Sequence, residues 1–183
     1  SGTNSSDNNF GNFKNISISG MKFEDMNGNG VKETGDNGLS GWTIELTKNS
    51  DADGSQTTGQ DGSYSFTDLG PGVYHVSEQT QSGWTQTYGN SGYTVTAVSG
   101  TNSSDNNFGN FKNITISGMK FEDMNGNGVK ETGDNGLSGW TIQLTKNENA
   151  DGSQTTVQDG SYSFTDLGPG VYHVSEQTQS GWT

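Results

Sequence analysis

The sequence contains no cysteine and no arginine, and its 183 residues include only two prolines and two histidines. Without cysteine the chain forms no disulfides, so cross-links of that kind cannot support a small core. Only 25% of the residues are hydrophobic, and no apolar run approaches the length of a membrane span. Eight basic residues stand against 21 acidic ones, for a net charge of −13. Such a surface repels nucleic acid and anionic lipid and attracts cations, so the composition argues against nucleic-acid binding.

The chain has instead an internal repeat of domain size. Residues 1–85 return as residues 99–183, a period of 98 residues, with five differences: Ser17/Thr115, Glu45/Gln143, Ser50/Glu148, Asp51/Asn149 and Gly59/Val157. This period is longer than the roughly 20–50 residues of solenoid units. It matches a domain of about 100 residues with its own modest core. The chain lacks an initiator Met and stops at "SGWT", so we expect it to be a segment of a longer array.

Short alternating runs rich in β-branched and aromatic residues predict strands throughout, and Gly, Asp, Asn or Pro separates them. No helical periodicity of useful length is present. Seven strands in one repeat predict an all-β fold, a tandem Ig-like β-sandwich. The expected strands are 16–25, 41–47, 62–69, 72–79, 83–88, 92–100 and 106–111.

The strand set also predicts where each repeat begins. A unit of residues 16–111 keeps all seven strands together, so residues 1–15 are expected to be the last strand of a preceding repeat. Residues 114–183 then form a second repeat that lacks its final strands. Because an incomplete sandwich exposes strand edges and core, we expect the second repeat to be completed by residues 1–15 of a neighbouring copy or by further sequence.

Two long stretches resemble a known family. "ISGMKFEDMNGNGVKETGDNGLSGWTIEL" (from Ile18) and "DGSYSFTDLGPGVYHVSEQTQSGWTQTY" (from Asp61) resemble the B-type repeat domains of serine-aspartate repeat adhesins and the related collagen-adhesin B-type modules. The resemblance implies prealbumin-like sandwiches arranged in tandem in the stalks of surface proteins. It also implies bound Ca²⁺ and, in some related modules, an internal Lys–Asn isopeptide bond.

The loop after the first strand has the spacing of a twelve-residue calcium loop. Oxygen donors fall at positions 1, 3, 5, 7, 9 and 12, with Gly30 at position 6, where the chain must turn sharply. An Asp at position 12, where a bidentate Glu is usual, predicts moderate affinity. The alternative is a solvated Asn/Gly turn. The expected ligands are Asp25, Asn27, Asn29, Val31, Glu33 and Asp36 in the first copy, and Asp123, Asn125, Asn127, Val129, Glu131 and Asp134 in the second.

A second acidic stretch, Asp51 and Asp53 in "SDADG", is interpreted as a hairpin turn. Its second copy has Asn149 in place of the first carboxylate, so the acidic pair is not repeated.

In the related modules that carry an isopeptide bond, a Lys on the first strand joins an Asn on the last, with a Glu between them. The matching residues are Lys22, Asn110 and Glu78. The reaction requires burial, which favours a neutral, nucleophilic Lys and a protonated Glu. Alternation places Lys22 on the face of Ile16 and Ile18, unless a bulge at Gly20 shifts the strand. The alternative is a set of ordinary exposed side chains.

In the second copy the corresponding pair is Lys120 and Glu176. Its Asn is expected from Asn12 of the next copy.

Nothing in the sequence supports catalysis. His75 and His173 occupy one repeat position with no second His at metal spacing, and the nucleophile-elbow, P-loop and dinucleotide motifs are absent. A binding module for glycan or a host protein is the alternative function, on an aromatic platform of Trp42, Trp84, Tyr88 and Tyr93. Glycosylation sequons occur at Asn4, Asn15, Asn102 and Asn113, with chance in an Asn/Ser/Thr-rich chain as the alternative.

We therefore predict an extracellular, calcium-binding repeat in the stalk of a cell-surface adhesin or an extracellular fibre. Its expected partners are neighbouring copies of the same repeat, by tandem contact or strand exchange. This segment is not expected to insert into a membrane.

Overall fold

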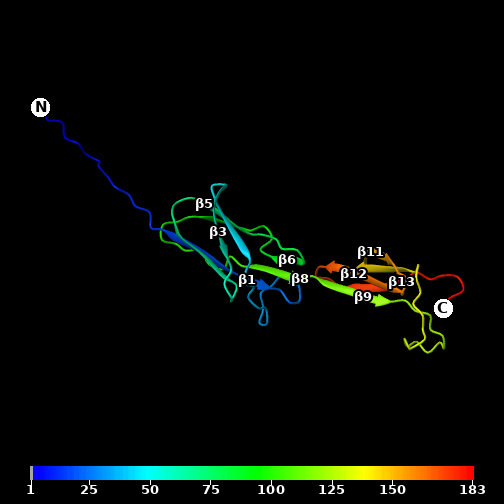
Figure 1. Cartoon of the computed structure of the whole chain (residues 1–183). Coiled ribbons are helices and arrows are strands. Elements are labelled where there is room, and N and C mark those ends of the chain that lie inside the picture. Colours follow the sequence, from blue (N-terminus) through cyan, green and yellow to red (C-terminus); the bar gives the residue numbers. More distant parts are fainter. Residues whose placement is uncertain (1) are drawn as a thin grey trace. The chain divides into compact units, whose positions relative to one another are not determined.

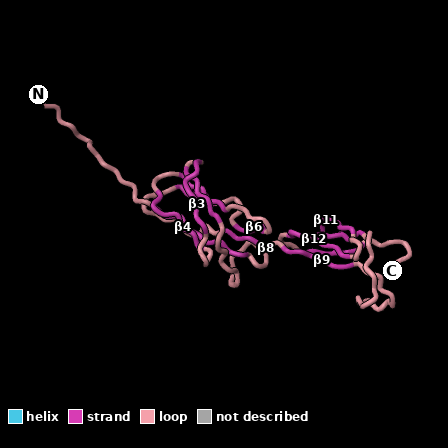
Figure 2. The backbone as a smooth tube through the Cα atoms, viewed as in Figure 1, coloured by secondary structure: helices cyan, strands magenta, loops and turns pink. Residues whose placement is uncertain are grey.

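The computed structural model describes residues 2–183, which divide into two compact units. The first comprises residues 2–26, 30–81 and 86–110, and the second comprises residues 27–29, 82–85 and 111–183. The described residues form strands and loops with no helix, hence no helix that could cross a membrane (Figure 2). The strands are β1 (Ile16–Glu24), β2 (Thr43–Lys48), β3 (Asp51–Thr57), β4 (Ser63–Leu69), β5 (Val73–Glu78), β6 (Trp84–Tyr88), β7 (Tyr93–Thr96), β8 (Phe108–Lys112), β9 (Ile114–Met119), β10 (Thr141–Lys146), β11 (Asn149–Thr155), β12 (Ser161–Leu167) and β13 (Tyr172–Glu176).

The first repeat forms two four-stranded sheets, with strand orders β4-β1-β8-β6 and β3-β2-β5-β7. Its strands alternate buried and exposed side chains, as in β2, where Ile44 and Leu46 are buried and Glu45 is exposed. Such alternation is typical of strands with one face on a core. The fold class is therefore confirmed as all-β. The core cluster contains Ile16, Ile18, Ile44, Leu46, Tyr64, Phe66, Leu69, Tyr74, Val76 and Phe108.

The strands β1 and β8 are neighbours although they come from opposite ends of the first repeat (Figure 1). They pair in parallel, with Lys22 opposite Phe108 and Glu24 opposite Asn110. On its other side β1 pairs with β4 in antiparallel register. The first and last strands of the repeat thus lie side by side in the middle of one sheet, with β4 and β6 at its edges.

The structure corrects the interpretation of Asp51 and Asp53 as a turn. These residues begin and continue β3, an edge strand of seven exposed residues that pairs with β2. The turn lies just before it, at Asn49 and Ser50, with φ angles of 49° and 75°. Two successive positive φ angles in a two-residue hairpin loop match the right-handed twist of the flanking strands. The first repeat consequently has eight strands, one more than the sequence predicts.

The second unit contains a two-stranded sheet, β12-β9, and a three-stranded sheet, β11-β10-β13. Its core cluster of buried residues is smaller and consists of Ile142, Leu144 and Phe164. Ile114, at the start of β9, is 43% exposed, whereas its repeat counterpart Ile16 is 2% exposed. Residues 2–15 form no strand. Their assignment to a preceding repeat stays a prediction, as do the unit boundaries 16–111 and 114–183.

Candidate isopeptide site and metal loops

Lys22 lies near the end of β1 and is completely buried. The pairing of β1 with β4 runs without a break from Ile18 to Met21, and the register shift lies earlier, between Ile16 and Ile18. Gly20 therefore introduces no bulge, and Lys22 stays on the face of Ile18. A lysine on this face of a central strand has to enter the core.

Asn110 reaches the same point from β8, where it is buried together with Phe108. Because the two residues are two positions apart on one strand, their side chains point to the same face of the sheet. The backbone strengthens this placement, because the Asp25 N–H donates a hydrogen bond of 2.9 Å to the Asn110 carbonyl oxygen. Glu78, at the end of β5 in the opposite sheet, supplies the third side chain.

The three side chains form a closed polar cluster inside the sandwich. Lys22 Nζ donates to Asn110 Oδ1 and lies 2.8 Å from Glu78 Oε2. Asn110 Nδ2 donates to Glu78 Oε1 at 2.8 Å. The side chains of Lys22 and Glu78 are 0% and 1% exposed. One carboxyl group therefore bridges the nitrogen that would attack and the nitrogen that would leave.

The surroundings of Lys22 make its neutral form more accessible than that of an exposed lysine. Burial lowers the pKa of its amine to about 8, against the opposing effect of the Glu78 carboxylate, which raises it. The Trp42 ring covers the amine, with Nζ 4.3 Å from the ring centroid. In the sequence, the alternation of Trp42 with Ile44 and Leu46 predicts only that Trp42 faces the core. Its contact with the lysine could not be predicted from that alternation, because Lys22 lies on β1 and Trp42 lies just before β2.

The second repeat contains two of the three groups. Lys120 Nζ lies 2.7 Å from Glu176 Oε2, but the side chains are 20% and 42% exposed. Trp140 covers the amine at 4.5 Å, as Trp42 does in the first repeat. Lys120, directly after β9, and Glu176, at the end of β13, thus form the same pair as Lys22 and Glu78.

The first predicted calcium loop is organised by two of its carboxylates. Asp25 is buried and accepts a hydrogen bond of 2.8 Å from the Gly30 N–H. Asp36 accepts hydrogen bonds from the Met26 and Glu33 N–H groups, at 3.2 and 2.8 Å. Gly30 has φ 73°, the left-handed conformation that a sharp turn at position 6 requires. The first and last predicted ligands thus anchor the loop.

In the second loop the predicted ligands at positions 3, 5 and 9 converge. Glu131 accepts hydrogen bonds from Asn125 Nδ2 at 2.8 Å and from Asn127 Nδ2 at 3.1 Å. The pKa of Asp123 is lowered, mainly because its carboxylate accepts a hydrogen bond from the Gly128 N–H. Among residues 2–183, no cluster of three or more Asp, Glu, His or Cys side chains could hold a metal ion by itself. A Ca²⁺ site in either loop would therefore need amide and main-chain oxygens beside the carboxylates, as calcium accepts.

The four predicted glycosylation sites differ in their environments. Asn4 and Asn15 are exposed, and Asn102 is exposed with its Oδ1 accepting from the Ser17 N–H. Both ends of the Asn113 amide are engaged, because Oδ1 accepts from Thr85 Oγ1 and Nδ2 donates to Asp166. A glycan on Asn113 would break the second of these bonds, so Asn113 is the least suitable of the four.

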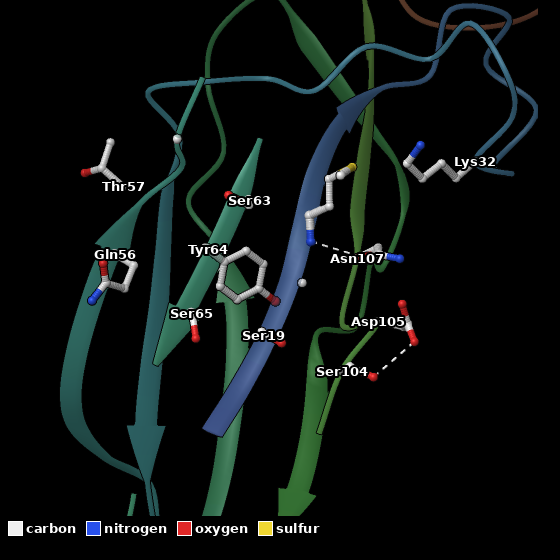
Figure 3. A pocket seen from close by; sticks show the side chains of 13 residues that line it. Ser19, Lys32, Gln56, Thr57, Ser63, Tyr64, Ser65, Ser104, Asp105 and Asn107 are labelled. Carbon is white, nitrogen blue, oxygen red and sulfur yellow. Dashed lines mark hydrogen bonds between the residues drawn. The ribbon is translucent and has the colours of Figure 1, made fainter. Parts of the chain in front are cut away.

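The residues of the predicted aromatic platform are not presented together. Trp42 is 3% exposed and covers Lys22. Tyr93 is half-buried and donates its hydroxyl to the Asn107 carbonyl oxygen. A surface pocket beside β1 and β4 is lined mainly by hydroxyl and amide groups (Figure 3). Its aromatic residue, Tyr64, is 5% exposed and donates to Asn106, so the pocket has no stacking surface.

Comparison with known proteins places the chain in a family. The model of the SdrD B-like domain matches residues 16–118 and again residues 114–183. Serine-aspartate repeat-containing protein D of Staphylococcus aureus (strain Newman) is 35% identical over 175 residues, which cover 88% of this chain and 13% of that protein. Protein F of the same name from Staphylococcus epidermidis is 33% identical over 174 residues, covering 88% and 10%.

Among solved structures, a streptococcal ancillary pilin aligns with a TM-score of 0.47 and 16% identity, over 92% of this chain and 55% of the pilin.

The chain spans a small fraction of the length of the two staphylococcal proteins. Because the family model covers most of the sequence in two successive matches, the chain belongs to the SdrD B-like domain family, which consists of extracellular repeat domains of cell-surface proteins and not of enzymes.

Proposed function

We propose that the chain is a load-bearing, calcium-stabilised spacer in the stalk of a cell-surface adhesin or an extracellular fibre. The observation that carries this function is the buried cluster of Lys22, Glu78 and Asn110, which connects the first and last strands of one repeat. A spacer has to resist extension, and a covalent bond at this place would prevent the repeat from extending.

The proposed bond is an isopeptide between Lys22 and Asn110. The neutral Lys22 amine attacks Asn110 Cγ, and its proton passes through the Glu78 carboxyl group to Asn110 Nδ2. The Cγ–Nδ2 bond then breaks, ammonia leaves, and Glu78 returns to its starting protonation state. Burial of the Glu78 carboxyl group favours this transfer, since no solvent competes for the proton.

The strand arrangement explains why this bond has mechanical value. The chain enters the first repeat at the start of β1 and leaves it at the end of β8, and the two strands pair in parallel. Tension between those ends pulls the strands in opposite directions and shears the contacts between them. A bond from Lys22 to Asn110 carries the load directly, so that residues 23–109 are left out of the loaded path.

Calcium is proposed as a second stabilising element. The ligands would be Asp25, Asn27, Asn29, the Val31 carbonyl, Glu33 and Asp36, with the corresponding residues 123–134 in the second repeat. The support is the all-oxygen donor set of the two loops and the turn at Gly30. When bound, the ion would neutralise carboxylates that the loop brings together.

The proposed partners are neighbouring copies of the repeat, in tandem or by exchange of a strand. The exposed sequons Asn4, Asn15 and Asn102 are the proposed glycan positions on such a stalk. A glycan there would extend from the surface without displacing a buried contact.

Stretching single molecules of the 183-residue chain by their two ends tests the load-bearing role. The wild type is expected to show no lengthening from residues 23–109. Asn110→Ala releases them and adds up to about 300 Å, at roughly 3.4 Å per residue. Asn12→Ala is the matched control, because Asn12 is the exposed repeat equivalent of Asn110. Equal lengthening in the wild type and in Asn110→Ala would contradict the proposed function.

A further inference from the structure

We propose that Asp25 couples the predicted calcium loop to the isopeptide site, so that Ca²⁺ bound by residues 25–36 accelerates formation of the Lys22–Asn110 bond. Asp25 acts as a positioning residue in this coupling, because it takes no part in the bond that forms or in the bond that breaks. The inference rests on the bond and the ion of the proposed function. It adds the regulation of one by the other.

The entry of the loop holds the strand that carries Asn110. Asp25 follows directly after β1, and its N–H donates a hydrogen bond of 2.9 Å to the Asn110 carbonyl oxygen. The Asp25 carboxylate accepts a hydrogen bond of 2.8 Å from the Gly30 N–H, inside the loop. Asp25 and Asn110 are 0% and 2% exposed. One buried residue therefore contacts the strand of Asn110 through its backbone and the loop through its side chain.

The exit of the loop holds the strand that carries Lys22. The Leu39 N–H donates to the Lys22 carbonyl oxygen at 2.9 Å, and the Glu24 N–H donates to the Asn37 carbonyl oxygen at 2.8 Å. These two bonds join β1 to the residues that follow Asp36, the last predicted ligand of the loop. The position of the Lys22 backbone therefore depends on where the loop ends.

Close packing transmits any movement of the loop exit to Lys22. A Cβ added to Gly38 would lie 1.9 Å from the Asp61 carbonyl oxygen, and a Cβ added to Gly62 would lie 2.1 Å from the Lys22 carbonyl oxygen. The Lys22 N–H also donates to the Gly62 carbonyl oxygen, at 2.8 Å. Since no gap separates these backbone segments, they move together.

Charge within the loop opposes its closure when no cation is bound. Asp25 and Asp36 stand at the two ends of the loop, and Glu33 lies between them. Like charges brought together repel. A bound Ca²⁺ supplies the opposite charge and attracts the carboxylates at both ends. Closure of the loop then fixes the strand of Lys22 and the strand of Asn110 at the same time.

Formation of the bond is sensitive to that placement. Glu78 holds the Lys22 and Asn110 side chains, whereas the ends of the loop hold their backbones. A misplacement of about 1 Å between reacting groups costs about 100-fold in rate. The chemistry itself is unchanged by the ion, and one ammonia still leaves for each Lys22–Asn110 bond.

The test is to make the 183-residue chain by cell-free synthesis, with calcium or with a calcium chelator and with Mg²⁺ held constant, and to follow its intact mass over time. We expect one ammonia to be lost in both reactions, about tenfold faster with calcium, which corresponds to a misplacement of less than about 1 Å without the ion. Asp25→Ala should abolish the acceleration. Asp25→Asn, which keeps an oxygen for the Gly30 N–H but loses the charge, should need more calcium for the same acceleration.

Asp51→Ala is the matched control, because it removes a carboxylate from the exposed strand β3, outside the loop. Calcium should accelerate its reaction as much as that of the wild type. A second measurement does not depend on the reaction. In Glu78→Gln, which cannot shuttle the proton, calcium should slow hydrogen exchange of the Asp25 and Leu39 amides, whose hydrogen bonds join the loop to the two reacting strands.

Equal rates of ammonia loss with calcium and with chelator would overturn this inference and leave the proposed bond standing. Acceleration that persists in Asp25→Ala would also overturn it, because the ion would then act at another place. Exchange of both amides that calcium leaves unchanged would have the same consequence. Absence of ammonia loss in every reaction would contradict the inference and the proposed function together.

Discussion

Replacing Asn110 by alanine is expected to lower the melting temperature of the first repeat by about 20 °C or more. A cross-link between Lys22 and Asn110 closes a loop that contains nearly the whole repeat. A link across about 100 residues lowers the conformational entropy of the unfolded chain and so raises the free energy of unfolding by roughly 4–5 kcal/mol. One kcal/mol shifts the melting temperature of a domain of this size by about 4–8 °C. Calorimetry of the full chain measures this change in the unfolding transition of the first repeat.

The choice of variant matters because the cluster is buried. Asn110→Ala keeps the Lys22–Glu78 ion pair, whereas Lys22→Ala would leave a buried carboxylate without its cation and destabilise for that reason as well. Asn12→Ala should leave the melting temperature of the first repeat unchanged. Glu78→Gln keeps the shape of the side chain but cannot shuttle the proton, so it should lower that melting temperature as Asn110→Ala does. An unchanged melting temperature in Asn110→Ala would argue against the bond.

Calcium is expected to raise the melting temperature of the first repeat by about 10 °C when its concentration is about 100 times the dissociation constant. At that ratio, binding to the folded state alone stabilises by roughly 2.7 kcal/mol. The Asp25→Ala variant should lose the response. Because Asp25 also holds the Gly30 N–H, each variant has to be compared with itself, with calcium and with chelator.

Asp51→Ala is the matched control for this experiment, because it removes one carboxylate from the exposed strand β3, outside the loop. It should keep the full calcium response. If Asp25→Ala responded to calcium as strongly as Asp51→Ala, the predicted ligand set would be wrong. General screening by a divalent cation would then explain the stabilisation, since both variants carry the same net charge.

Strands with one buried face could be predicted from the sequence, because alternation reports burial directly. Ile44 and Leu46 in β2 show this pattern. Strand β3 could not be predicted, because all seven of its residues are exposed and it is specified by the turn at Asn49 and Ser50. An edge strand without an apolar face carries no hydrophobic period.

The cluster at Lys22 could be predicted in part. Residue spacing gives the inward direction of Lys22 and Asn110, and the family resemblance supplies Glu78. The parallel pairing of β1 with β8 and the Trp42 ring over the amine depend on contacts across about 20 to 90 residues. One strand's pattern contains no information about such contacts, so they required the structure.

Calcium binding by the two loops stays a prediction. The spacing of residues in each loop predicts an ordered set of oxygen donors, and the structure shows how Asp25 and Asp36 anchor the first loop through backbone N–H groups. A solvated turn also uses such bonds. The loop geometry alone therefore does not separate the two interpretations, and the calcium response does.

The most direct test of the covalent spacer is the intact mass of the freshly purified 183-residue chain, followed by mapping of its peptides. We predict the loss of one ammonia for the first repeat and a branched peptide that joins Lys22 to Asn110. The same measurement on Glu78→Gln should give the full, unreacted mass. A wild-type chain with no mass loss and with separate peptides containing Lys22 and Asn110 would contradict the account.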